Sequence, residues 1–167
     1  MSGWEAVTQS GQDEPGFAGW QQRLMDLAAN DLGINRVRLE IRSGTENPVD
    51  SYAAYRAGTI TESQWKNSRY AAVNDNADPN VINPGGFHFS AIDRSITEII
   101  QPLRQRLAAR GEQLYVSLNY VSFGGATVHT ANPPEYAELL VATFQHMQST
   151  YGWVPDAVEI ILEPDNG

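Results

Sequence analysis

The sequence predicts an α/β fold in which parallel strands alternate with helices, as in part of a (β/α)8 TIM barrel. Segments with the apolar spacing of strands alternate with segments that have the spacing of helices, and helical crossovers make successive strands parallel. Each predicted strand also carries one polar face, which suits a barrel lumen better than an open sheet covered on both sides. The chain has 167 residues. A whole barrel needs about 250, so we expect roughly the first four strands with their helices.

The first predicted elements are a helix over residues 17–30 and a strand over 35–42. Gly33 follows the helix at the position of a left-handed cap. In the strand, apolar and charged residues alternate strictly, so that one face is apolar. The stripe that we expect the helix to bury consists of Phe17, Trp20, Leu24, Leu27 and Ala28.

A long connection, 43–89, separates this strand from the next helix. We expect one short helix in it, with Thr61 and Gln64 as a capping box, and connections of this length are usually functional. The helix that follows begins at Ser90, and Pro102 inside it should kink or split it.

The last predicted elements are a strand over 113–120, a helix that begins after the cap residue Asn132, and a strand over 157–163. Pro133 is expected as the first residue of that helix, and Glu135 as the capping partner at its third position. We expect its buried face to consist of Tyr136, Leu139, Leu140, Thr143, Phe144 and Met147.

The polar strand faces hold the candidate functional residues. If the strands are consecutive, Arg38, Glu40, Glu159 and Glu163 should lie near one another and compensate each other's charge, because an isolated buried charge is very costly. Glu163 ends its strand, where barrel enzymes place catalytic groups. The alternative is that this face is solvated and Glu163-Pro164 is an ordinary turn.

Composition excludes several classes of function. The net charge of -9 leaves no basic surface for nucleic acid, and no apolar stretch is long enough to cross a membrane. No cysteine is present, so disulfides and thiol chemistry are excluded. The N-terminus has no signal-peptide pattern, and it begins in a polar segment that predicts no strand. Both ends are abrupt, and we therefore expect residues 1–167 to be the N-terminal half of one catalytic domain, truncated at both ends.

Three segments together resemble clan A glycoside hydrolases. Residues 33–39 (GINRVRL), the strand that ends in Asn119-Tyr120, and residues 158–164 (VEIILEP) look like strands two, three and four of those (β/α)8 enzymes. Residues 3–6 (GWEA) are similar to the end of strand one in families 5, 30 and 39. The resemblance spans nearly the whole chain.

The resemblance implies a retaining β-glycosidase that acts on a carbohydrate without a cofactor. Glu163 would be the general acid/base, and Arg38 would support a nucleophile that lies beyond residue 167, in the missing C-terminal half of the barrel. This chain alone would then be inactive, and a secreted or periplasmic location would suit the full-length protein. Leu162 departs from the family, which usually has Asn there to hold the sugar 2-hydroxyl. The substrate-binding residues would be Arg38, Glu40, Asn119, Tyr120, Trp4 and Glu5.

Other interpretations remain open. For Trp4 and Glu5, the alternatives are a place in the substrate cleft and ordinary packing. For Asn119 and Tyr120, they are binding of sugar hydroxyl groups and anchoring of a loop. The whole barrel is an enzyme of this class, an inactive carbohydrate-binding or structural protein, or a different barrel enzyme. Residues 74–78 offer oxygen ligands but lack the Gly and distal Glu of an EF-hand, which favours a turn. The three histidines, including His129 in a predicted loop, have no metal-ligand spacing, so we expect no catalytic metal.

Overall fold

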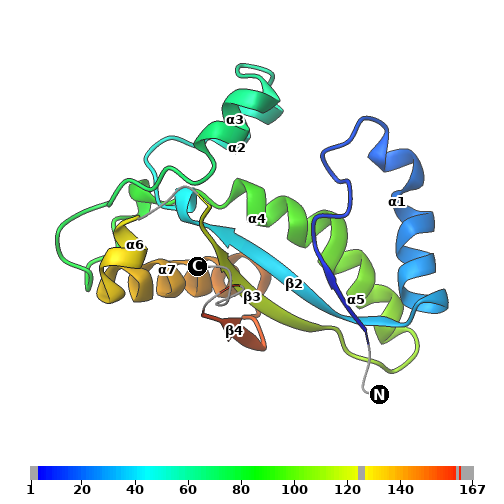
Figure 1. Ribbon diagram of the computed structural model, residues 1–167. Helices are drawn as coiled ribbons and strands as arrows, with labels where there is room; N and C mark the ends of the chain where they lie inside the picture. The colour runs from blue at the N-terminus through cyan, green and yellow to red at the C-terminus, as the bar shows by residue number, and fades with distance from the viewer. Residues whose placement is uncertain (1–3, 124–126, 161, 163–167) are drawn as a thin grey trace. The chain divides into compact units, whose positions relative to one another are not determined.

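The computed structural model describes residues 4–123, 127–160 and 162, which form two compact units (Figure 1). The first unit contains residues 1–40, 92–119 and 155–167, and the second contains 41–91 and 120–154. Both units draw on separated stretches of sequence.

The first unit is built on a parallel sheet with strand order β1-β2-β3-β4. The strands are β1 (Trp4–Val7), β2 (Ile34–Arg42), β3 (Tyr115–Val121) and β4 (Ala157–Glu159), and the last two residues of β2 and of β3 belong to the second unit. The register pairs Val7 with Arg38, and Asn119 with Glu159. A mixed α/β fold with a parallel sheet is therefore confirmed.

The apolar patterns predicted β2 and β3 to within two residues at each end, and they did not predict β1. Val37, Leu39, Val116 and Leu118 are at most 1% exposed, so the predicted apolar face is the buried one. β1 corrects the expectation that the N-terminus has no strand. Its four residues are too few to show an alternating pattern, and only the resemblance of residues 3–6 pointed to it.

The first helix is α1 (Phe17–Asp26), which continues as a π-helical turn, η1 (Leu27–Asp31). Its extent agrees with the prediction, and Gly33 has the expected positive φ of 67°. The predicted stripe was only partly right. Phe17 is buried, but Trp20 and Leu27 are each 38% exposed, and Met25 and Ala29 are buried instead. The edge of the Trp20 ring packs against Phe17.

The second long helix is α4 (Ser90–Ser95), the π turn η4 (Ile96–Ile100) and α5 (Gln101–Ala108). Pro102 lacks the N–H that an α-helix would use, and the wider π turn just before it accommodates this loss. The predicted kink or split at Pro102 takes the form of this π turn just before the proline, and the helix continues through it. The apolar face of the helix supplies the core of the first unit, with Ile96, Ile99, Leu103 and Leu107 at most 2% exposed.

The second unit is mainly helical. Its elements are η2 (Ser43–Thr45), α2 (Ser51–Arg56), α3 (Glu62–Ser68), η3 (Pro84–Gly86), α6 (Val128–Ala131) and α7 (Pro133–Tyr151). α3 has the predicted capping box of Thr61 and Gln64. The sequence predicted neither α2 nor α6, because helices of six and four residues are too short for apolar periodicity.

The buried face of α7 differs from the predicted one in a way that matters for the site. Leu139, Thr143 and Met147 are buried as expected, but so are Glu135 and Glu138, which are 3% and 2% exposed. Glu135 was expected to cap the helix. Among the described residues, no helix is long and apolar enough to cross a membrane.

Candidate functional site

Charged side chains of opposite sign meet on one face of the sheet in the first unit. Nε of Arg38 lies 3.1 Å from Oε1 of Glu5, and its Nη1 lies 3.8 Å from Oε2 of Glu159. Arg36 lies 3.6 Å from the other Glu5 oxygen. These side chains are about one third exposed, so each pair contributes at most about 1 kcal/mol. The expectation that Arg38 and Glu159 lie close together is confirmed, and Glu5 joins them.

The other predicted residues of this face are more scattered. Glu40 accepts a hydrogen bond from the Gln9 amide. Trp4 is 58% exposed. Asn119 is 1% exposed, and its Oδ1 has no hydrogen-bond partner in the described part of the chain. Tyr120 follows Asn119 directly, and neighbouring strand residues face opposite sides, so one ligand cannot contact both side chains from one face of the strand.

Glu163, the predicted general acid/base, lies outside the described residues. The predicted strand over 157–163 was too long: β4 ends at Glu159, residues 160 and 162 are bends, and Leu162 is partly exposed. The catalytic role of Glu163 stays a prediction.

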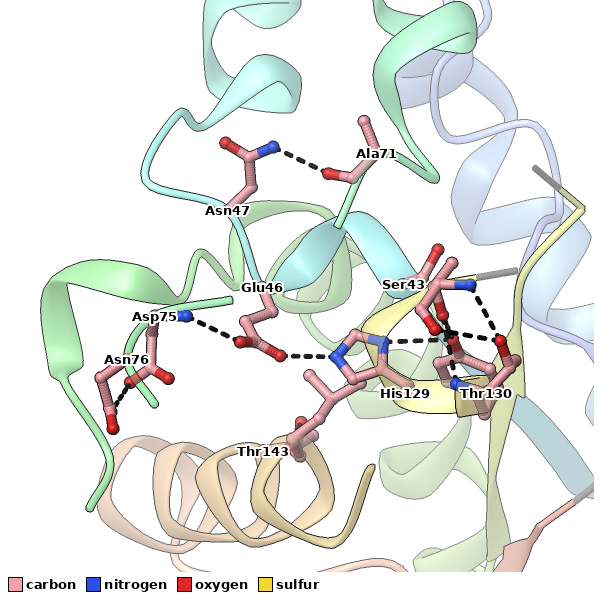
Figure 2. A network of polar contacts seen from close by, with 12 residues as sticks. Ser43, Glu46, Asn47, Ala71, Asp75, Asn76, His129, Thr130 and Thr143 are labelled. Atoms are coloured by element: carbon pink, nitrogen blue, oxygen red, sulfur yellow. Dashed lines mark hydrogen bonds and ion pairs between the residues drawn. The ribbon is translucent and has the colours of Figure 1, made fainter. Parts of the chain in front are cut away.

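A second polar cluster lies in the core of the second unit and is centred on Glu46 and His129 (Figure 2). The two side chains are fully buried, and Nε2 of His129 lies 2.5 Å from Oε2 of Glu46. Nδ1 of the same ring lies 3.1 Å from the hydroxyl of Tyr120, which also lies 3.1 Å from Oγ1 of Thr127. Both ring nitrogens are therefore engaged, and the ring orientation is fixed.

Asp75 joins this cluster from the long connection. Its backbone N–H donates to Oε1 of Glu46 over 2.9 Å, as Figure 2 shows. Its Oδ2 accepts from the backbone N–H of Asn83 and from the Asn76 amide, at 2.6 Å and 2.9 Å. Oδ1 is buried and has no hydrogen-bond partner among the residues described.

Two carboxylates of α7 complete the cluster. Glu135 is in the first turn of the helix, where the helix dipole favours a negative charge. Glu138 is one turn further along, and both of its oxygens are buried without a hydrogen-bond donor in the described chain. Ligand oxygens of Glu46, Asp75 and Glu135 lie within 4.8 Å of one another, close enough to share one cation. These four side chains form the carboxylate cluster: Glu46, Asp75, Glu135 and Glu138.

The electrostatics of the carboxylate cluster are unfavourable for four full negative charges. Burial raises the pKa of Glu138 to about 7, with further contributions from Asp75, Glu135 and Glu46. Burial also raises the pKa of the nearby Tyr136 hydroxyl to about 12, which keeps it protonated. Among the described residues, no arginine or lysine forms an ion pair with these carboxylates, and the His129 ring contacts Glu46.

Sequence reasoning missed this cluster, although parts of its signal were present. His129 was assigned to a loop and residues 74–78 to a turn, whereas Glu135 was assigned to capping. Glu135 lies four residues before Leu139 and Glu138 four residues before Ala142, and both of these apolar residues are buried. Carboxylates on the buried face of an amphipathic helix are the signal that could have found the cluster.

Comparisons with models of known protein families, with curated proteins and with solved structures find no match. The residues themselves therefore carry every statement about function.

We expect the stability of the protein, measured in the presence of a metal chelator, to depend on pH through Glu138. The pKa of Glu138 is raised from 4.5 to about 7 in the native state, so between these values the native state binds more protons than the unfolded state. The stabilisation that the native state gains from protonated Glu138 is fully present below about pH 4.5 and is lost as the pH rises through about 7. Urea unfolding should be measured at pH 5, 6, 7 and 8. The free energy of unfolding should fall less steeply with rising pH in Glu138→Gln than in the wild type. Glu62→Gln, an exposed carboxylate paired with Lys66, is the matched control and should keep the wild-type slope.

Proposed function

We propose that this chain is the N-terminal half of a (β/α)8 barrel that belongs to a retaining β-glycosidase. The observation that carries the proposal is the strand order: four parallel strands are neighbours in the order in which they occur in the sequence. A doubly wound sheet reverses its strand order at a switch point, whereas a barrel does not.

The charged strand face supports the same proposal. A barrel lumen holds residues from alternate strands in common layers, and Arg38 on β2 pairs with Glu159 on β4, two strands away. Glu5 on β1 contacts the same guanidinium. A fixed arginine among carboxylates on a strand face suits a site that positions an anionic nucleophile.

In the proposed mechanism Glu163 protonates the leaving glycosidic oxygen and then removes a proton from the attacking water. The nucleophile would come from the second half of the barrel, with the two carboxyl groups about 5–5.5 Å apart. Arg38 would orient that nucleophile. Trp4 is exposed and would offer its face to a sugar ring.

The test uses the protein at its full natural length. Glu163→Ala and Glu163→Gln should lower kcat/KM for alkyl β-glycosides about 10²–10⁴-fold, because general acid catalysis is lost. Aryl glycosides with good leaving groups need less protonation, so their loss should be smaller. Glu112→Gln, in an exposed pair with Arg110, should leave both rates unchanged.

Two outcomes would contradict the proposal. The first is an intact protein without a further strand ending in Glu, since a retaining mechanism needs the second carboxylate. The second is equal loss of activity with both classes of leaving group, which would remove Glu163 from proton transfer.

The second candidate function is a catalytically inactive barrel that binds carbohydrate. Leu162 favours it, because the resemblance expects Asn at that position as a contact for the sugar. Saturable binding of an oligosaccharide without turnover, weakened by Trp4→Ala, would support this candidate over the enzyme.

A further inference from the structure

The carboxylate cluster of the second unit has the chemistry of a cation site. Glu46 and Glu135 are buried and Asp75 is partly buried, and the three ligand oxygens lie within 4.8 Å of one another. Oxygen donors of this kind are preferred by Ca²⁺, Mg²⁺ and Mn²⁺. Without a cation, three carboxylates so close together repel one another in a region that water hardly reaches.

Glu138 is an independent observation that points to a ligand in the same place. It is 2% exposed, neither of its oxygens accepts a hydrogen bond from an N–H or hydroxyl group of the described chain, and its side chain lies against the carboxyl group of Glu135, another acid. Its charge interacts with those of Asp75, Glu135 and Glu46. A buried glutamate without a donor is rare, because its desolvation is not compensated.

The ligands are held in place before any ion binds. The backbone carbonyl of Glu46 accepts from the Val73 N–H over 2.8 Å, and its side chain is fixed by His129 and by the Asp75 N–H. Asp75 is fixed in turn by the Asn83 N–H. Hydrogen bonds of this kind to ligating carboxylates orient them and raise metal affinity.

We propose that Glu46, Asp75 and Glu135 bind one divalent cation, with Ca²⁺ as the expected ion and Glu138 as a fourth ligand. Ca²⁺ takes six to eight oxygen ligands in a flexible geometry, whereas Mg²⁺ keeps several of its waters and is seldom bound by a cluster of protein carboxylates alone, so Ca²⁺ suits this cluster better. The ion would be structural, joining the connection 43–89 to the start of α7. This proposal does not depend on the glycosidase proposal.

The surface of the second unit offers a path to the site. An open depression of about 490 Å³ is lined by Glu138, together with Pro79, Pro134 and Gln145. Glu138 is the member of the carboxylate cluster that lines this depression. An ion would enter past Glu138 and bring water molecules to complete the six to eight oxygen ligands that Ca²⁺ takes.

Calorimetric titration and thermal unfolding test the proposal on chelator-treated protein. Ca²⁺ should bind at one ion per chain, and at a hundredfold excess over Kd it should raise Tm by about 5–10 °C. Mg²⁺ should give a smaller shift at the same concentration. Asp75→Asn and Glu138→Gln should each lower the Ca²⁺ affinity at least tenfold.

The same variants distinguish loss of the ion from loss of the fold. In chelator, Glu138→Gln should have a Tm equal to or above that of the wild type, because it removes a buried repulsion. Asp78→Asn is the matched control: Asp78 is in the same segment, is exposed, and accepts hydrogen bonds from Asn80. It should keep the wild-type affinity.

Two results would overturn the proposal. One is a Tm that none of Ca²⁺, Mg²⁺ and Mn²⁺ changes. The other is a Ca²⁺ response that Asp78→Asn abolishes and Asp75→Asn leaves intact, which would place the ion in the exposed loop.

Discussion

His129→Ala is expected to destabilise the protein by about 3–5 kcal/mol. The substitution leaves Oε2 of Glu46 buried beside other carboxylates without its partner, and it removes one of the two groups that contact the Tyr120 hydroxyl. It also leaves a cavity where a fully buried ring had been. Urea unfolding followed by tryptophan fluorescence, in chelator, measures the change.

Two further variants separate the charge from the cavity. Glu46→Gln in the His129→Ala background should recover part of the lost stability, because no unpaired charge then remains. His146→Ala is the control for removing an imidazole: His146 is on α7 and stacks on Phe89 at 4.1 Å, outside the carboxylate cluster. His146→Ala should therefore lower the free energy of unfolding by less than His129→Ala does. A double variant no more stable than His129→Ala alone would contradict the charge argument.

Gly86→Ala is expected to destabilise the protein by about 3 kcal/mol, as overpacking does where neighbours cannot move. An added Cβ would lie 2.2 Å from the Cβ of Asp75 and 3.1 Å from its Cα. Asp75 cannot withdraw without breaking its bonds to Asn83 and Glu46. The substitution should therefore also weaken Ca²⁺ binding, although Gly86 contributes no ligand.

Gly85→Ala is the matched control for this steric effect. Its added Cβ would meet nothing closer than Oδ1 of Asn83 at 3.5 Å, an ordinary contact. Stability within about 0.5 kcal/mol of wild type is expected, as for most substitutions away from the core. Equal effects of the two substitutions on unfolding and on calorimetric Ca²⁺ titration would show that the close approach to Asp75 is not the cause.

The fold was predictable where the sequence pattern is local. The alternation of Val37, Leu39 and Ile41 is set by the period of a strand, and the box of Thr61 and Gln64 by hydrogen bonds three residues apart. Pro102 acts on its own turn of helix. Such features depend on a few adjacent residues, so a single sequence contains them.

The carboxylate cluster was not predictable in the same way, because its members converge only in the folded unit. Glu46, Asp75 and Glu135 come from three separated segments, and no short pattern relates them. Glu135 also satisfies the rule for a helix start, so a local explanation already existed for it. On the strand face, the pairing of Arg38 with Glu159 was predicted because strand phase and strand order were both readable. Glu5 was named as a cleft residue from the resemblance alone, and its pairing with Arg38 was not predicted because no strand pattern covers β1.

The separation of 83 positions between Glu46 and His129 in the sequence has a consequence for the order of folding. Closing so long a loop loses much chain entropy, so we expect this contact to form late, after the local helices. Interactions that form after the transition state slow unfolding without speeding folding. A cation bound among these residues would therefore mainly lengthen the lifetime of the native state, and its removal would mainly raise the unfolding rate.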